Sequence, residues 1–133
     1  MSDCIFCKIV KGKIPCYKVW EDEIYLAFLS VAPHHEGHVL LIPKRHENYF
    51  YDLKDSEMID LIKRSKPIAK RLKEVFKPKS GKIGVVFAGG GVPHVHMHLI
   101  PFDDEKAFDF KAARHNVTPS EFEETLRKIG TIN

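Results

Sequence analysis

The apolar residues of this chain fall into short runs separated by polar turns, a pattern typical of β-strands. The first two runs are joined by the polar segment Glu21-Asp22-Glu23, which indicates a hairpin. The run that ends at Pro43 is apolar almost throughout, as is expected of a buried strand. The pattern predicts strands at 16–20, 24–29, 37–43, 83–88 and 94–101.

Helical periodicity appears in two places. Between residues 55 and 76 the apolar positions recur every three or four residues, which predicts a long helix with Asp55 or Ser56 as its N-cap. Pro67 lies inside this stretch and is expected to kink or split it. A last helix is expected after Thr118, because Thr118-Pro119-Ser120-Glu121 combines an N-cap, a proline at the first helical position and a capping box.

The order of these elements predicts an α+β fold. Strands dominate the first half, the long helix follows, and two more strands precede the C-terminal helix, which favours a mostly antiparallel sheet. Residues 4–10 form a short helix or a knuckle in this interpretation, and 103–116 is polar and irregular. A chain of 133 residues fits a single domain, 1–133.

Composition excludes several classes of function. The formal net charge is +3, and no dense Lys/Arg run with interleaved aromatic residues argues for nucleic-acid binding. The Lys-rich stretch 63–79 has helical spacing, which is typical of a solvated helix face. The opening residues do not resemble a signal peptide, and no apolar run is long enough to span a membrane. We therefore expect a cytoplasmic protein without nucleic-acid or membrane partners.

Three cysteines are present, and two of them, Cys4 and Cys7, form a C-x-x-C pair. In a chain without an export signal this pattern favours metal or redox chemistry over a disulfide framework. A redox motif is the weaker alternative, because no β-α-β pattern surrounds the pair. Cys16 is interpreted as a core or strand thiol.

The stretch from His94 to Pro101 is the most informative part of the chain. Side chains alternate between the two faces of a strand, so His94, His96 and His98 share one face and the apolar residues between them share the other. Three imidazoles in a row stabilise a sheet poorly, because they titrate near neutral pH and repel one another when charged. Catalysis, a metal-binding trio and a polar face that happens to use histidine are the alternatives.

Gly89-Gly90-Gly91 lies just before this stretch. Glycines allow positive φ angles and leave backbone N–H groups open to a ligand, so such a turn can bind a phosphate. Alone, three glycines are more often only a turn. Next to the histidines, they suggest a phosphate site.

The histidine stretch, read as Gly91-Val92-Pro93-His94-Val95-His96-Met97-His98-Leu99-Ile100-Pro101, resembles the signature of the histidine-triad (HIT) superfamily. The opening from Cys4 to Pro15 resembles zinc-bearing bacterial and archaeal members, and the chain is similar to the Hint branch. Ala27-Phe28-Leu29 and the segment from Gly37 to His46 are also similar. The resemblance covers 4–101 and implies a HIT-like fold, with 102–133 as a C-terminal extension.

The resemblance implies nucleophilic catalysis. His96 is expected to attack the α-phosphorus of a nucleotide, giving a nucleotidyl-histidine that water or another acceptor resolves. The implied activity is that of a nucleotide-phosphate hydrolase or nucleotidyl transferase, similar to purine nucleoside phosphoramidases and acting on AMP or an adenylyl conjugate. The other nucleotide-binding positions implied are His38, His98, Gly90, Gly91, Val92, Ser30 and Val31. For His38, a strand histidine with a purely structural role is the alternative.

The resemblance also implies a structural zinc ion. Family members with the N-terminal cysteine pair use the two cysteines, the histidine after Ile-Pro-Lys-x and the first histidine of the triad. In this sequence these are Cys4, Cys7, His46 and His94. Two thiolates and two imidazoles make a tetrahedral zinc set with no open position.

Three positions depart from the family's pattern. Ser30 replaces an acidic residue that binds the ribose, Phe87 stands near a usual asparagine, and the glycine loop lacks the usual Gln or Gln-Ser. A nucleotide-binding module with little or no catalysis is therefore a second hypothesis, and a zinc-dependent scaffold is a third.

Family members are usually homodimers, so a homodimer is expected here. The contact is expected to use the helix at 55–76 and the strand that precedes it. Three further histidines, His34, His35 and His115, lie in loops or irregular segments. For His34 and His35 exposure to solvent is expected, and no role is expected for His115.

Overall fold

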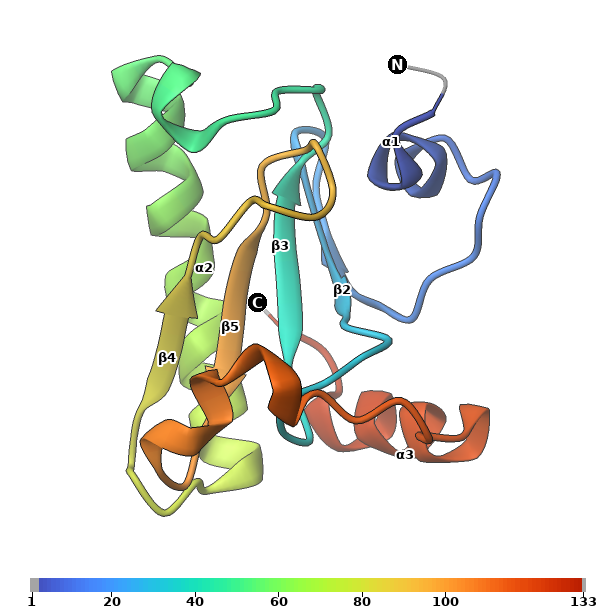
Figure 1. Cartoon of the computed structure of the whole chain (residues 1–133), viewed down its shortest axis with the longest axis vertical. Coiled ribbons are helices and arrows are strands. Elements are labelled where there is room, and N and C mark those ends of the chain that lie inside the picture. The colour runs from blue at the N-terminus through green and yellow to red at the C-terminus, as the bar shows by residue number, and fades with distance from the viewer. Residues whose placement is uncertain (1–2, 133) are drawn as a thin grey trace.

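A computed structural model describes residues 3–132, and its strands form one antiparallel five-stranded sheet (Figure 1). The order across the sheet is β1-β2-β3-β5-β4, so β3 is central and β1 and β4 are the edges. These elements confirm the predicted α+β class. The strands are β1 (Lys18–Glu21), β2 (Tyr25–Leu29), β3 (Val39–Pro43), β4 (Ile83–Val86) and β5 (Met97–Pro101).

The predicted hairpin joins β1 to β2. The Asp22 carboxylate accepts hydrogen bonds from the backbone N–H groups of Ile24 and Tyr25, at 2.8 and 2.7 Å. This is how a short acidic side chain closes a tight turn. The strands then pair with Glu21 opposite Leu26.

The sheet is covered differently on its two faces. The long helix α2 (Asp55–Phe76) and the C-terminal helix α3 (Pro119–Ile129) bury their apolar residues against one face, which forms the larger core. The short helix α1 (Ile5–Val10) packs on the other face through Phe6 and Cys7. Because strand side chains alternate, β2 and β3 contribute to both cores.

Helix α2 differs from the prediction in two respects. Its N-cap is Lys54, not Asp55 or Ser56, because the Glu57 carboxylate accepts from the Lys54 backbone N–H at 3.1 Å. Pro67 does not split the helix, which runs unbroken to Phe76. Buried Leu61 and Ile68 anchor it on both sides of the proline, so packing offsets the lost hydrogen bond.

The beginning of α3 is as predicted. Thr118 is the N-cap, its hydroxyl accepts from the Glu121 N–H at 3.2 Å, and Pro119 is the first helical residue. The segment before it was expected to be irregular, but it contains two 3₁₀ turns, Glu105–Phe108 and Phe110–Ala112. An aspartate side chain caps each turn from the preceding position, a short-range signal that hydrophobic periodicity does not reveal.

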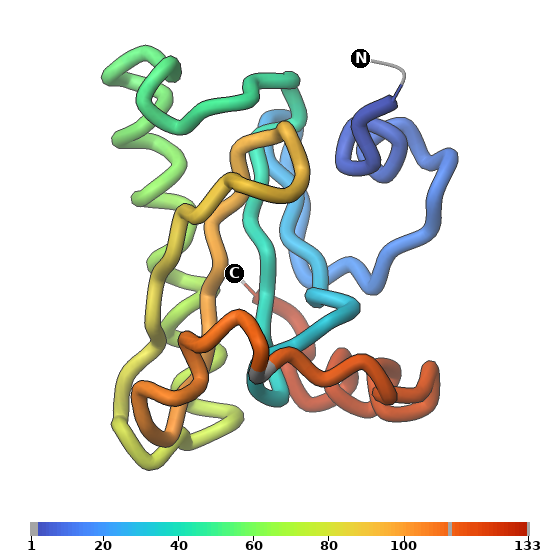
Figure 2. Tube along the Cα trace, viewed as in Figure 1, coloured from blue at the N-terminus to red at the C-terminus, as the bar shows by residue number. Residues whose placement is uncertain are grey.

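The chain after β5 runs back along the loop that joins β2 to β3, as Figure 2 traces. The Arg114 N–H donates to the Pro33 carbonyl at 2.8 Å. Phe108 packs directly over Gly84 of β4, where any side chain would collide with its ring. The C-terminal segment is thereby held against the same end of the sheet as this loop.

Two further observations concern surfaces. The strand before α2 is β3, which is paired on both sides and therefore offers no free edge to a second subunit. Within residues 3–132 no helix combines the length and the apolar character that a membrane span requires.

Candidate catalytic and metal-binding site

The histidine segment enters the sheet later than predicted. The β5 ladder begins at Met97, not at His94, because the Val95 N–H donates to the Glu47 carbonyl at 2.7 Å and not to a neighbouring strand. The alternation of faces is nevertheless confirmed. Val95, Met97 and Leu99 belong to the larger core. The three histidines therefore face away from α2.

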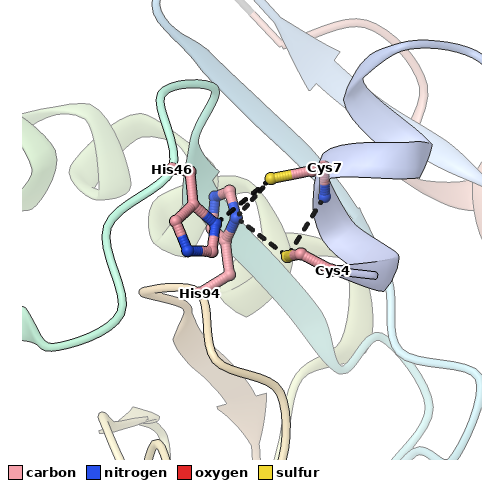
Figure 3. Close-up of side chains that lie close together, drawn as sticks. All are labelled: Cys4, Cys7, His46 and His94. Carbon is pink, nitrogen blue, oxygen red and sulfur yellow. Dashed lines mark hydrogen bonds between the residues drawn. The ribbon is translucent and has the colours of Figure 1, made fainter. Parts of the chain in front are cut away.

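Four side chains from three parts of the chain meet beside α1 (Figure 3). Cys4 caps α1, Cys7 lies in its first turn, His46 follows β3, and His94 precedes β5. One ligand atom from each lies within 4.8 Å of all the others. The structure thus brings together the four residues that the resemblance names.

The distances in this cluster fit a tetrahedral metal ion. Nδ1 of His94 lies 3.4 Å from the Cys4 sulfur and 3.5 Å from the Cys7 sulfur, and Nδ1 of His46 lies 3.2 Å from the Cys7 sulfur. Ordinary zinc bond lengths give a sulfur–nitrogen edge of about 3.5 Å in a tetrahedron. These three sulfur–nitrogen distances are therefore those of a group that could hold a metal ion.

The protonation of His94 suits a metal ligand. Its Nε2–H donates to the Pro43 carbonyl at 2.8 Å, which leaves the Nδ1 lone pair directed at the cysteines. Burial lowers the pKa of His94, which keeps the imidazole neutral. Neutral imidazole is the form that binds a metal ion.

A backbone carbonyl fixes the tautomer of His96. Its Nδ1 lies 2.7 Å from the His94 carbonyl oxygen. A carbonyl only accepts, so Nδ1 carries the proton and Nε2 keeps its lone pair. The ring is buried and meets the edge of Phe6 at a centroid distance of 5.1 Å, which fixes its plane.

His38 and His98 form a pair beside the His96 ring. Nε2 of His38 lies 2.9 Å from Nδ1 of His98, and the rings of His96 and His98 are 5.0 Å apart. Burial, followed by the neighbouring histidines, lowers the pKa of His38 to about 2 and that of His98 to about 4. Both rings are therefore neutral at physiological pH.

His34 was expected to be exposed, but the structure places it in the site. Its ring is half-buried, its Nδ1 lies 2.6 Å from the Ala107 carbonyl oxygen, and its backbone N–H donates to Nδ1 of His38 at 3.0 Å. No sequence signal identifies this residue, because the partner of its ring, Ala107, lies 73 positions away in the sequence. His35, also expected to be exposed, is half-buried against Asp103, whereas His115 is exposed.

Three other expected nucleotide-binding positions, Ser30, Val31 and Val92, differ in their exposure. Ser30 is buried, and its hydroxyl accepts from the Ala32 N–H at 3.3 Å. Val31 is 72% exposed, and Val92 packs against the smaller core. Ser30 and His38 also line a cavity of about 530 Å³ between α3 and the loop that joins β2 to β3.

The glycine loop is open to solvent. Only Gly89 has a positive φ, of 73°, and nothing lies within 4 Å of a side chain built at Gly89, Gly90 or Gly91. A cavity of about 290 Å³ separates Gly89 from Tyr49, Tyr51 and the His96 ring. A ligand on His96 therefore has room toward this loop.

Fold and site together define a histidine-triad protein. A family model described as the HIT domain matches residues 11–105, and the chain belongs to this family. It is 40% identical over 110 residues to an adenosine 5'-monophosphoramidase of Schizosaccharomyces pombe, with 77% of each chain covered. It is 37% identical to an uncharacterized HIT-like protein of Borreliella burgdorferi, with 97% of each covered.

A solved structure shares the fold. It is that of a hypothetical histidine triad nucleotide-binding protein from Sulfolobus tokodaii, which matches with a TM-score of 0.81 at 27% identity. The match covers 95% of this chain and 89% of that chain. The fold implied by the sequence resemblance is thereby confirmed.

Proposed function

We propose that this protein cleaves nucleotide conjugates at the α-phosphate, with His96 as the nucleophile and an adenosine 5'-monophosphoramidate as a representative substrate. The observation that carries the proposal is the hydrogen bond from Nδ1 of His96 to the His94 carbonyl, which leaves the Nε2 lone pair for attack. The relative from S. pombe is an adenosine 5'-monophosphoramidase, which supports the choice of substrate.

The reaction proceeds in two displacements. In the first, Nε2 of His96 forms a bond to the α-phosphorus, the phosphorus–nitrogen bond breaks, and the amine departs with a proton taken from water. In the second, water attacks the phosphorus and the bond to Nε2 breaks, which releases AMP and a proton. The His94 carbonyl stabilises the positive charge that the ring of His96 carries in the intermediate.

We further propose that the metal ion held by Cys4, Cys7, His46 and His94 is zinc. Two sulfur and two imidazole ligands are a typical structural zinc set, and four protein ligands leave no position for substrate. When bound, zinc would supply a cross-link between α1 and the sheet and would take no part in the chemistry. Both displacements depend on groups of the polypeptide chain alone.

A second candidate, nucleotide binding without efficient turnover, is favoured by the residues around the histidines. Ser30 offers one hydroxyl where relatives carry a carboxylate, and that hydroxyl already accepts from Ala32. Phe87 stacks on Phe50 at a centroid distance of 4.1 Å and offers no hydrogen bond. Ser30 and Phe87 therefore offer fewer hydrogen bonds to the ribose and the leaving group, whereas the proposed nucleophile, His96, is present.

Release of AMP from adenosine 5'-monophosphoramidate tests the proposal. The wild-type protein is expected to turn over, His96→Ala to lose turnover, and His115→Ala to behave like the wild type, because His115 lies exposed outside the site. Mass spectrometry of the quenched reaction should show an adenylyl group on His96. AMP binding by the wild-type protein without any AMP release would establish the binding-module alternative.

We also propose a homodimer formed along β4 and α2. Strand β4 is a sheet edge, and Val85 on it is 54% exposed. On α2, Ile59 and Ile62 are 56% and 52% exposed. Sedimentation analysis is expected to show a dimer for the wild type and a monomer for Val85→Lys; a monomeric wild-type protein would contradict this proposal.

A further inference from the structure

The main chain of the loop between β2 and β3 forms a hydrogen bond with His38, which pairs with His98. The backbone N–H of His34 donates to Nδ1 of His38 at 3.0 Å. A backbone amide only donates, so Nδ1 of His38 must be the acceptor and carries no proton. Since His38 is buried and neutral, its single proton lies on Nε2.

The same reasoning continues to His98. The Nε2–H of His38 faces Nδ1 of His98 at 2.9 Å, so Nδ1 of His98 is an acceptor. Neutral His98 then carries its proton on Nε2. Among the residues that the structure describes, this nitrogen has no hydrogen-bond partner, and the His98 ring is only partly buried. The chain of bonds ends with a free N–H donor beside the His96 ring, 5.0 Å away between centroids.

The ring of His34 holds the loop in this position. Its Nδ1–H donates to the Ala107 carbonyl at 2.6 Å, and the adjacent Pro33 carbonyl accepts from the Arg114 N–H at 2.8 Å. Both partners belong to the C-terminal segment, beyond the match to the HIT domain, which ends at residue 105. The segment after β5 therefore holds the loop in place from outside the region that the family model matches.

We propose that His34 is a positioning residue: its backbone N–H sets the tautomer of His38 and, through it, that of His98, while its ring keeps the loop bound to Ala107. The inference rests on the proposed function and deepens it. Both ring nitrogens of His38 are occupied in this chain, so His38 acts on the phosphate through His98. His98 in turn presents Nε2–H to a phosphoryl oxygen as a hydrogen-bond donor. It does not supply the leaving group's proton, because loss of that proton would leave an imidazolate.

Ring ¹⁵N–¹H correlation spectra of the wild-type protein test the series of hydrogen bonds from His34 to His98 without any substrate. At neutral pH both His38 and His98 are expected in the Nε2–H form. An Nδ1–H form of His98 would overturn the proposal. This measurement is independent of turnover: if the tautomers are as expected and the protein releases no AMP, the proposed function fails and the positioning chain stands.

Substitution of His34 tests the role of its ring. His34→Ala is expected to give mixed His98 tautomers and to lower kcat for AMP release roughly tenfold, with KM little changed, as is typical when the partner that orients a functional histidine is lost. The amide of His34→Asn can still donate to Ala107, so this variant is expected to keep most of the wild-type kcat and mostly the Nε2–H tautomer of His98. Unchanged His98 tautomers and unchanged kcat in His34→Ala would refute the role.

The neighbouring His35 provides the matched control. Its ring contacts Asp103 and the Glu36 carbonyl and lies outside the chain of bonds to His98. His35→Ala is expected to leave both the tautomers and kcat at wild-type values. An equal loss in His35→Ala and His34→Ala would show a general effect of the loop and contradict a specific role for His34.

Discussion

The carbonyl oxygen of His94 lies 2.7 Å from Nδ1 of His96, while the ring of the same His94 belongs to the Cys4/Cys7/His46/His94 cluster. One residue thus connects the proposed metal site to the proposed nucleophile. The His94 ring is fixed from both sides, by the cysteines and by the Pro43 carbonyl. We therefore expect the orientation of the His96 imidazole to depend on the integrity of the proposed metal site.

Metal removal is expected to weaken both stability and catalysis. A zinc chelator should lower the thermal unfolding midpoint and AMP release together, since zinc binding to structural sites in zinc-finger peptides contributes about 10–16 kcal/mol to folding. Calorimetry with metal analysis before and after chelation checks this. Cys7→Ser should reproduce the effect, and Cys16→Ser, which alters a thiol outside the cluster, should not. If the metal-free protein kept the activity and stability of the metal-bound protein, the orientation of His96 would not depend on the metal site.

Stability is expected to fall with acidification. The pKa of His38 is lowered to about 2 and that of His98 to about 4, whereas both are near 6.5 in the unfolded chain. The unfolded state therefore binds protons that the folded state excludes, so their stabilising contribution is complete above about pH 6.5. Below it, each group costs at most about 1.4 kcal/mol per pH unit, down to its folded pKa.

Denaturant unfolding at several pH values measures this loss. His38→Gln removes one titrating group but keeps a donor for His98, so its unfolding free energy should depend less steeply on pH between about 6 and 4. Loss of metal in acid affects both proteins equally and cancels in the comparison. Parallel pH profiles for the two proteins would show that His38 is not the group responsible.

Gly37 is expected to tolerate no side chain. It has a φ of 88°, and an added Cβ would lie 2.5 Å from the ring of Phe76. Gly37→Ala should lower the free energy of unfolding by about 1–3 kcal/mol. Gly12 is the matched control, since its φ of 76° is similar but nothing lies within 4 Å. An equal cost for Gly12→Ala and Gly37→Ala would mean that backbone strain alone, and not Phe76, is responsible.

Ser30→Asp is expected to tighten nucleotide binding. A carboxylate at this buried position can accept from the ribose hydroxyls, and a hydrogen bond to a charged group contributes about 1.5–3 kcal/mol, so AMP should bind roughly tenfold more tightly. Titration calorimetry with AMP and with its 2',3'-dideoxy analogue checks the cause. Only AMP should gain affinity. A similar gain with Ser30→Asn, or with the dideoxy analogue, would point away from a ribose contact.

Much of the fold follows from short-range patterns. The capping box at Thr118 and the alternation of histidine with apolar residues depend on neighbours along the chain, and both are present. The metal cluster was implied by the family resemblance, and the structure brings its four members together. Such features need no knowledge of how distant segments pack.

Other features depend on packing and were missed. The unbroken passage of α2 through Pro67 rests on buried residues on both sides of the proline. The role of His34 depends on Ala107, which is far away in sequence and offers only a carbonyl group. No residue type marks a position whose function lies in its main chain. Contacts of this kind can only be read from the folded structure.

The alternation between core and site along His94–Leu99 also constrains how the length of this protein can change. An insertion or deletion of one residue there would exchange the faces of the histidines and the apolar residues. Imidazoles would then lie in the core and Met97 would lie in the site. This segment can therefore accept substitutions but no change in length. At Gly89–Gly91 no atom lies within 4 Å of an added Cβ, so this loop has room for a change in length. Divergence in leaving-group preference is then expected to proceed through the length of this loop.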